Sequence, residues 1–184
     1  MKIRFNEAKA TQAAARLLKL RGGEMSYMKL VKLLYIVDRE ALLRWGRPVT
    51  TDCYVSMDRG PVLSRTMDLI TDGVPPSQQS VWAEHISEPE HYKVRLQKEA
   101  GADELSDAEL ALIEEVFGKY GALNRWKLVD LVHSFSEWQN PSGGAIRISY
   151  RDILKAGGKT DWEIAAIEEE LENLAAADRL LPAM

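Results

Sequence analysis

The segment from Tyr27 to Trp45 most constrains the fold, because it predicts a helix that is apolar on nearly every side. Ser26 precedes this helix and is a residue type that caps helix starts. Gly46 and Pro48 follow it, and neither residue readily continues a helix. A helix without a polar face is normally enclosed by other elements. We therefore expect this segment to be the central helix of the domain.

The next segment changes its pattern twice. Residues 51–57 alternate between polar and apolar types, which predicts a short strand. Gly60 and Pro61 then place a proline at the first position of a second predicted helix, where its missing N–H has no structural consequence. We expect this helix to reach about Thr71.

The remaining chain predicts further helices and little sheet. An alanine-rich pattern predicts a helix over residues 7–20, and sequences typical of capped starts predict four more. These begin at Ser106, Asn124, Ser149 and Thr160, and the last runs over 160–181. Residues 73–102 form a variable insert, in which the alternation of residues 92–96 predicts a strand that pairs with its neighbour or with Tyr54 and Val55.

Together these patterns predict a mainly helical α+β fold. We expect one domain over residues 1–184, with six to seven helices and a small antiparallel sheet. With 46% hydrophobic residues, the chain is rich enough in apolar side chains to bury one core.

Composition also limits the function classes. Cys53 is the only cysteine, so an intrachain disulfide and a cysteine-rich zinc site are excluded, and we expect Cys53 to be a small apolar residue in a strand. The N-terminus lacks the apolar run of a signal peptide, and no stretch approaches the roughly 18 apolar residues of a spanning helix. A cytoplasmic location without membrane contact is the expectation.

Charge is divided unevenly along the chain. Residues 1–70 hold 13 Lys and Arg against 7 Asp and Glu, and residues 71–184 hold 11 against 21. This division predicts a dipolar molecule, although charged faces are most often simply solvated.

Two blocks of motifs resemble the Panacea domain of SocA-like antitoxins. The first, over residues 24–72, combines Lys29-Leu-x-Lys-Leu-Leu-Tyr35 with a Gly46-Arg-Pro48 turn and Gly60-Pro61-Val62. The second, over residues 105–156, contains a Leu-Ser-Asp start, a Tyr-Gly pair and several spaced single residues. The motif residues that we assign to the framework are Leu33, Tyr35, Gly46, Pro48, Gly60, Pro61, Val62, Trp126, His133 and Trp138.

The resemblance implies an antitoxin that acts by binding rather than by catalysis. Such a protein recognises a cognate toxin and neutralises it, either by occupying it or by presenting it to a ClpXP-type protease. It implies no cofactor and no metal. A DNA-binding or phage-related regulatory module is the alternative.

Residues with the potential for catalysis do not form a recognisable site. No nucleophile elbow, dinucleotide fingerprint or zinc signature is present. Asp130, His133 and Glu137 are spaced to share one helical sector, but three ligands on a single helix cannot surround an ion. We therefore interpret His133 as a structural residue that ties its helix to a loop, and we do not expect an enzyme.

One side of the central helix is a candidate partner surface. Lys29, Lys32, Arg39 and Arg44 lie on it together with Leu33 and Ile36. Either another element buries the apolar pair, or they form an apolar spot with a cationic rim, as a protein interface requires. Under the second interpretation, Lys29, Lys32, Ile36 and Arg39 contact the toxin, and Trp82 of the variable insert adds an aromatic anchor.

The last predicted helix presents a similar choice. Ile164, Ile167, Leu171 and Leu174 form an apolar stripe, which is most often part of the core. The same stripe also suits docking on a partner or on a second copy of the chain.

Overall fold

The computed structural model describes residues 4–75 and 77–180, and in this part of the chain it contains eight helices and five short strands. The mainly helical α+β fold is confirmed; the helix that the sequence did not predict is the short α4. The elements are α1 (Glu7–Leu20), β1 (Glu24–Ser26), α2 (Tyr27–Trp45), β2 (Tyr54–Met57), β3 (Gly60–Leu63), α3 (Ser64–Thr71), α4 (Val81–His85), β4 (Lys93–Arg95), α5 (Asp107–Tyr120), α6 (Arg125–His133), β5 (Ile146–Ile148), α7 (Tyr150–Ala156) and α8 (Asp161–Leu180).

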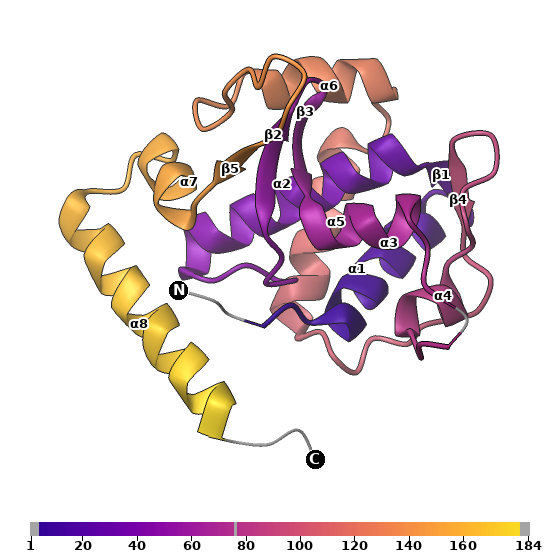
Figure 1. Cartoon of the computed structure of the whole chain (residues 1–184), viewed down its shortest axis with the longest axis horizontal. Coiled ribbons are helices and arrows are strands. Elements are labelled where there is room, and N and C mark those ends of the chain that lie inside the picture. Colours follow the sequence, from indigo (N-terminus) through magenta and orange to yellow (C-terminus); the bar gives the residue numbers. More distant parts are fainter. Residues whose placement is uncertain (1–3, 76, 181–184) are drawn as a thin grey trace.

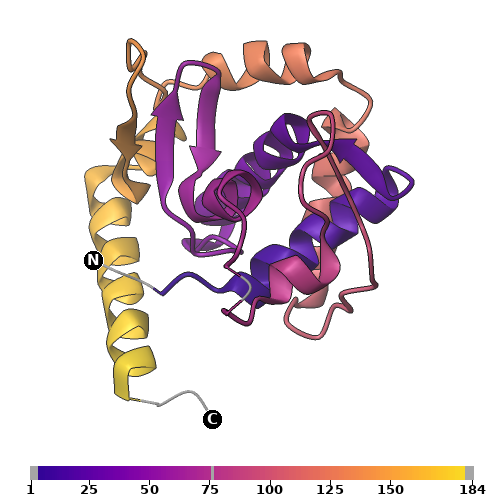
Figure 2. The same ribbon diagram turned by 45° about the vertical axis from the view of Figure 1, so that its right-hand side comes forward.

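Helix α2 lies at the centre of the molecule, as its composition predicts. It contacts α1, α5, α6, α7 and β3, and Figures 1 and 2 show it enclosed between the β2–β3 hairpin and the other helices. Every residue from Lys29 to Asp38 is buried. Leu33 and Tyr35, two of the motif residues, are 0% exposed. An all-round apolar helix is thus stabilised by neighbours on every side.

Most helix starts follow local capping chemistry, and the exceptions are α2 and α3, whose first turns have no side-chain cap. Ser106 and Ser149 form capping boxes, Asn124 accepts hydrogen bonds from two backbone N–H groups, and Thr160 pairs with Glu163 in the same way as the boxes. The predicted cap at Ser26 is wrong, because its buried hydroxyl has no hydrogen-bond partner among the described residues. Ser26 lies in β1, and the N–H of Tyr27 instead donates to the carbonyl of Tyr92 at 3.0 Å.

Two small antiparallel sheets accompany the helices, and they correct three predictions. Gly60 and Pro61 begin strand β3 rather than a helix, which starts only at Ser64. Proline is tolerated there because β3 is an edge strand of the sheet β3-β2-β5. Strand β4 pairs with β1, not with Tyr54 and Val55, whose other neighbour is the unpredicted β5. Cys53 precedes β2 and is exposed rather than a packed strand residue.

The turn after α2 is fixed by Asp38, a fully buried aspartate. Its carboxylate accepts hydrogen bonds from the N–H of Val49 (3.0 Å), the N–H and hydroxyl of Thr50, and the hydroxyl of Tyr54 (3.0 Å). Burial raises the pKa of Asp38 to about 6, although the hydrogen bonds from Thr50 and Tyr54 oppose the shift. The residues after the Gly46-Arg-Pro48 turn are therefore hydrogen-bonded to Asp38 of α2.

The basic excess of the N-terminal residues is partly matched inside the fold. Lys9, Arg16 and Arg44 form ion pairs with Glu109, Glu114 and Glu115, which all lie on α5. Because these pairs join the basic and acidic parts of the chain, the charge division along the sequence does not translate directly into two separate charged faces.

Helix α8 lies along one side of the molecule and extends downward in Figure 1. Its stripe is only partly core, since Ile164 and Leu171 are buried whereas Leu174 is 40% exposed. Gly46 permits this packing, because a Cβ at that position would lie 3.3 Å from the Ile167 side chain. Among the described helices, none combines the length and apolarity needed to cross a membrane. That residues 1–184 form one domain stays a prediction.

Candidate partner-binding groove

Most of the predicted basic face of α2 lies inside the fold, although Arg44 remains exposed. Lys29 is 6% and Lys32 is 1% exposed, and Leu33 and Ile36 are buried as well, so of the two interpretations of this side burial of the apolar pair is confirmed and the exposed partner surface is wrong. Lys29 Nζ donates to the carbonyls of Gly121 and Leu123, and Lys32 Nζ donates to the carbonyl of Pro61 at 2.7 Å. The long aliphatic stems of these lysines pack in the core, while the ammonium of Lys29 donates to the loop after α5 and that of Lys32 donates to strand β3.

Arg39 is mostly buried in an ion pair. Its Nε lies 2.7 Å from a carboxylate oxygen of Glu137, whose side chain is 0% exposed, and its guanidinium lies 4.3 Å from the centre of the Phe135 ring. Tyr35 donates its hydroxyl to the same carboxylate at 3.0 Å. Burial, with the charge of Glu137, raises the pKa of Tyr35. Glu137 thus locks α2 to the segment after α6.

Trp82 is also buried, at 2% exposure, and is therefore not an exposed anchor. Its backbone N–H donates to the carboxylate of Glu7 at 3.0 Å, which holds the short helix α4 against α1. The variable insert thus uses its tryptophan to attach itself to the helical body.

The second motif block divides between framework and surface. Trp138 donates its indole N–H to the carbonyl of Met57 at 3.1 Å, and its ring lies 4.1 Å from the ring of His133. Trp126, in contrast, is 49% exposed, so its predicted framework role is corrected to a surface position beneath the guanidinium of Arg59. Side chains on the first turn of a helix that lies at the rim of a domain have little opportunity for burial.

No metal site forms around His133. Helix α6 ends at His133, so Glu137 does not continue the same helical sector and turns inward to Arg39 instead. Across residues 4–75 and 77–180, no group of three His, Cys, Asp or Glu side chains is arranged to hold a metal ion.

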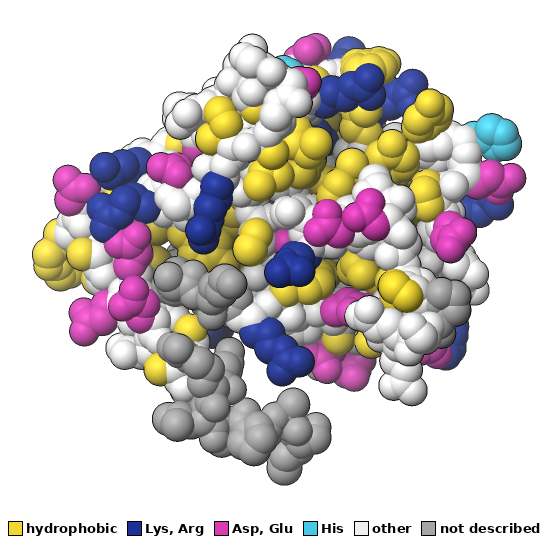
Figure 3. Space-filling view, in the orientation of Figure 1, with side chains coloured by type: hydrophobic (Ala, Val, Ile, Leu, Met, Phe, Trp, Pro, Cys, Tyr) yellow, Lys and Arg dark blue, Asp and Glu magenta, His cyan; other side chains and the backbone are white. Residues whose placement is uncertain are grey.

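One apolar groove lies at a position that the sequence did not indicate as a site. We name it the methionine groove; it has a volume of about 250 Å³ and lies between the start of α2, the β2–β3 hairpin, α3 and the loop before β5. Figure 3 shows hydrophobic side chains in this region, with Lys and Arg above them. The lining residues are Tyr27, Met28, Val31, Lys32, Met57, Asp58, Arg59, Gly60, Val62, Met67, Gly143 and Gly144.

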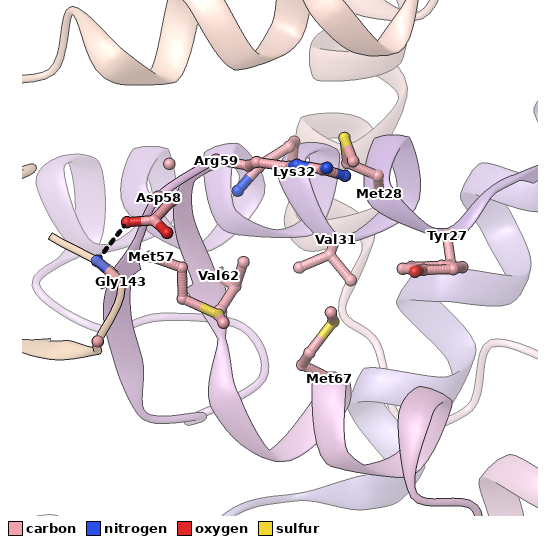
Figure 4. Close-up of a pocket in the computed structure, with 12 residues that line it drawn as sticks. Tyr27, Met28, Val31, Lys32, Met57, Asp58, Arg59, Val62, Met67 and Gly143 are labelled. Atoms are coloured by element: carbon pink, nitrogen blue, oxygen red, sulfur yellow. Dashed lines mark hydrogen bonds between the residues drawn. The ribbon is translucent and has the colours of Figure 1, made fainter. Parts of the chain in front are cut away.

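The walls of the methionine groove differ in chemistry. In Figure 4, Lys32 and Arg59 lie along the upper wall of the groove, and Met57, Val62 and Met67 lie below them. Asp58 at the end of the groove accepts a hydrogen bond from the N–H of Gly143 at 2.9 Å, which ties the loop to the hairpin. Flexible methionine side chains adapt to the shape of a partner, and an apolar centre with a charged rim is typical of protein interfaces.

A sequence signal for this groove exists in retrospect. Gly60-Pro61-Val62 was identified as a motif, and Met57, Asp58 and Arg59 immediately precede it. The hairpin places these residues on the same groove as Met28 of α2 and Met67 of α3. Only the tertiary fold shows that the three methionines line one groove.

A mainly helical body that carries an apolar groove with cations at its rim has the arrangement that a binding domain requires. A family model described as "Antitoxin SocA-like, Panacea domain" matches residues 30–139, which is well over half of the chain. The chain belongs to this family. A search of curated proteins and a search of solved structures each gave no match.

Lys32 makes the free energy of unfolding depend on pH. Burial lowers its pKa from 10.5 to about 7, because the apolar surroundings disfavour the ammonium. Below pH 7 the folded protein holds this buried cation, which lowers its free energy of unfolding. Between pH 7 and pH 10.5 only the unfolded chain binds the proton, so the free energy of unfolding rises with pH over this range.

We therefore expect Lys32→Met to stabilise the protein relative to wild type more at pH 6 than at pH 9. The difference between the two pH values should amount to about 3 kcal/mol, given about 1.4 kcal/mol per pH unit for one proton over the two units from pH 7 to pH 9. Urea unfolding of both proteins at each pH measures it. The control is Lys127→Met, since Lys127 is exposed and its replacement should give parallel curves; parallel curves for Lys32→Met as well would contradict the burial argument.

Proposed function

We propose that this protein is an antitoxin that binds a cognate protein toxin through the methionine groove and neutralises it. The observation that carries the proposal is the groove itself, an adaptable apolar surface with Lys32 and Arg59 at its wall, on a chain of the antitoxin SocA-like family.

The DNA-binding alternative receives little support from the surface. Lys29 and Lys32 are buried, and Arg39 and Arg44 are paired with Glu137 and Glu115, so the cations on which that alternative depended are not available to phosphates. Binding to duplex DNA requires cations that are free to neutralise phosphates.

The test is a co-expression rescue with the toxin gene that we expect beside the gene of this protein. We expect Met57→Asp to abolish rescue and to weaken toxin binding by about 30-fold or more, since loss of a central interface anchor costs about 2 kcal/mol. Because Met57 is 37% exposed, the variant should lose less than about 1 kcal/mol of stability. Purified variants in a titration calorimeter give the affinity.

The matched control is Trp162→Asp, which places the same charge at an exposed apolar side chain on α8 that does not line the groove. It should rescue as wild type does. Rescue by Met57→Asp, or equal loss in both variants, would reject the methionine groove as the toxin site.

The same experiment addresses how the toxin is neutralised. Neutralisation by occupancy leaves the amount of toxin unchanged on an immunoblot, whereas delivery to a ClpXP-type protease shortens the toxin half-life only when that protease is present. We favour occupancy as the common first step, since delivery also requires the toxin to be held.

A further inference from the structure

The ammonium of Lys32 has hydrogen-bonding capacity that the fold does not use. Lys32 lines the methionine groove and is 1% exposed, yet among the described residues its Nζ donates only to the carbonyl of Pro61. A lysine ammonium has three N–H donors. Two donors of a buried cation therefore remain beside an apolar cavity.

A buried cation of this kind is completed by an anionic acceptor. An ammonium in an apolar environment is unfavourable unless a charge or hydrogen-bond partner compensates it. Asp58, the acidic residue of the groove, already accepts from Gly143, and Arg59 adds a second positive charge to the wall. The electrostatics of the groove therefore favour a carboxylate that arrives from outside.

The walls next to the ammonium restrict which carboxylate fits. Met28, Met57 and Met67 surround the cavity with apolar surface that must also be covered. An Asp or Glu side chain brings too few apolar atoms. The last residue of a polypeptide carries its side chain and its carboxylate on the same Cα. One apolar terminal residue can therefore cover the methionine wall with its side chain and place its carboxylate on the ammonium.

We propose that the methionine groove binds the C-terminal residue of the partner polypeptide, with its apolar side chain on Met28, Met57 and Met67 and its carboxylate on Lys32 Nζ. This inference rests on the proposed function and names the part of the toxin that is recognised. Gly60 supports the geometry, since a Cβ there would approach Lys32 Nζ to 3.4 Å.

Carboxylate binding of this kind is coupled to the proton on Lys32. The other titratable groups near its ammonium are Tyr27 on α2, Asp58 and Arg59 on the hairpin, and His133 on α6. Because burial lowers the pKa of Lys32 to about 7, the ammonium is present at pH 6 and mostly absent at pH 8.5. Affinity for a free carboxylate should therefore fall as the pH rises.

The experiment uses the full chain labelled with carbon-13 at the methionine methyl groups and observed by NMR. The probes are acetyl-Gly-Gly-Ser-Leu with a free carboxylate, the same peptide with an amidated C-terminus, and N-acetylleucine. Met28, Met57 and Met67 report on the groove, and the buried Met25 is the internal control. Each probe is titrated at pH 6 and pH 8.5, into wild type and Lys32→Met.

We expect the free-acid peptide to shift the three groove methyl signals in a saturable way and to bind at least about tenfold more tightly than the amide, because charge-assisted bonds to a buried ammonium are strong. Its affinity should fall at least about fivefold from pH 6 to pH 8.5, and Lys32→Met should remove both differences.

Equal affinities for acid and amide would overturn the proposal, as would a pH dependence that persists in Lys32→Met and therefore does not come from Lys32. N-acetylleucine that binds as tightly as the peptide would also overturn it, in favour of a small carboxylic acid. If the peptides fail while Met57→Asp still abolishes rescue, the antitoxin role and its groove stand and only the C-terminal recognition is rejected.

Discussion

Replacing Glu137 with alanine is expected to lower the free energy of unfolding by about 3–5 kcal/mol, the range observed when one member of a buried ion pair is removed. The Glu137 side chain is 0% exposed and accepts hydrogen bonds from Tyr35 and Arg39. Without it, the guanidinium of Arg39, which is 13% exposed, remains on the ring of Phe135 with no buried counter-charge. Urea denaturation followed by circular dichroism measures the loss.

Two further variants separate charge from packing. Glu137→Gln keeps the shape and an acceptor, so it should lose less than Glu137→Ala. The double variant Arg39→Met with Glu137→Leu removes both charges and should recover most of the stability, because well-packed apolar residues often replace a buried pair at little loss. An alanine variant within about 1 kcal/mol of wild type would show that the pair does not hold α2 in place.

Replacing Gly60 with alanine is expected to destabilise the protein by about 2–4 kcal/mol, from overpacking and from a left-handed backbone combined. Gly60 has a φ of +92°, and a Cβ at this position would lie 2.6 Å from a methyl group of Val132. The added atom would force β3 away from α6, at the base of the methionine groove. Thermal unfolding with urea titration gives the change.

Gly22 provides a matched control. It has nearly the same φ, +91°, but nothing lies within 4 Å of a Cβ built on it. Gly22→Ala should therefore show only the backbone effect, about 1–2 kcal/mol. If Gly60→Ala is no more destabilising than Gly22→Ala, the contact with Val132 plays no part in fixing the hairpin.

The parts of the fold that depend on neighbouring residues in the chain could be predicted from the sequence. The helix starts at Ser106, Asn124, Ser149 and Thr160 were predictable, because a cap and the backbone that it satisfies lie within three residues of each other. The central place of α2 followed from its composition.

The candidate site was not predictable in the same way. Lys29 and Lys32 appear in the sequence as surface cations, and only the carbonyls of Gly121 and Leu123, after α5, and of Pro61, in β3, make their burial favourable. The local pattern assigns Pro61 to a helix start, but a proline is equally compatible with an edge strand. The sequence does not decide between the two, because the pairing of β2 with β3 is a tertiary property. Trp126 was expected in the framework and is exposed, whereas Trp82 was expected at the surface and is buried. The exposure of each side chain depends on neighbours that the local pattern does not contain.

The loop before β5 sets the shape of one end of the methionine groove. Gly143 and Gly144 close one end of the methionine groove, yet the family match ends at residue 139. Insertions or replacements in this short stretch can reshape that end while leaving the buried scaffold around α2 unaltered.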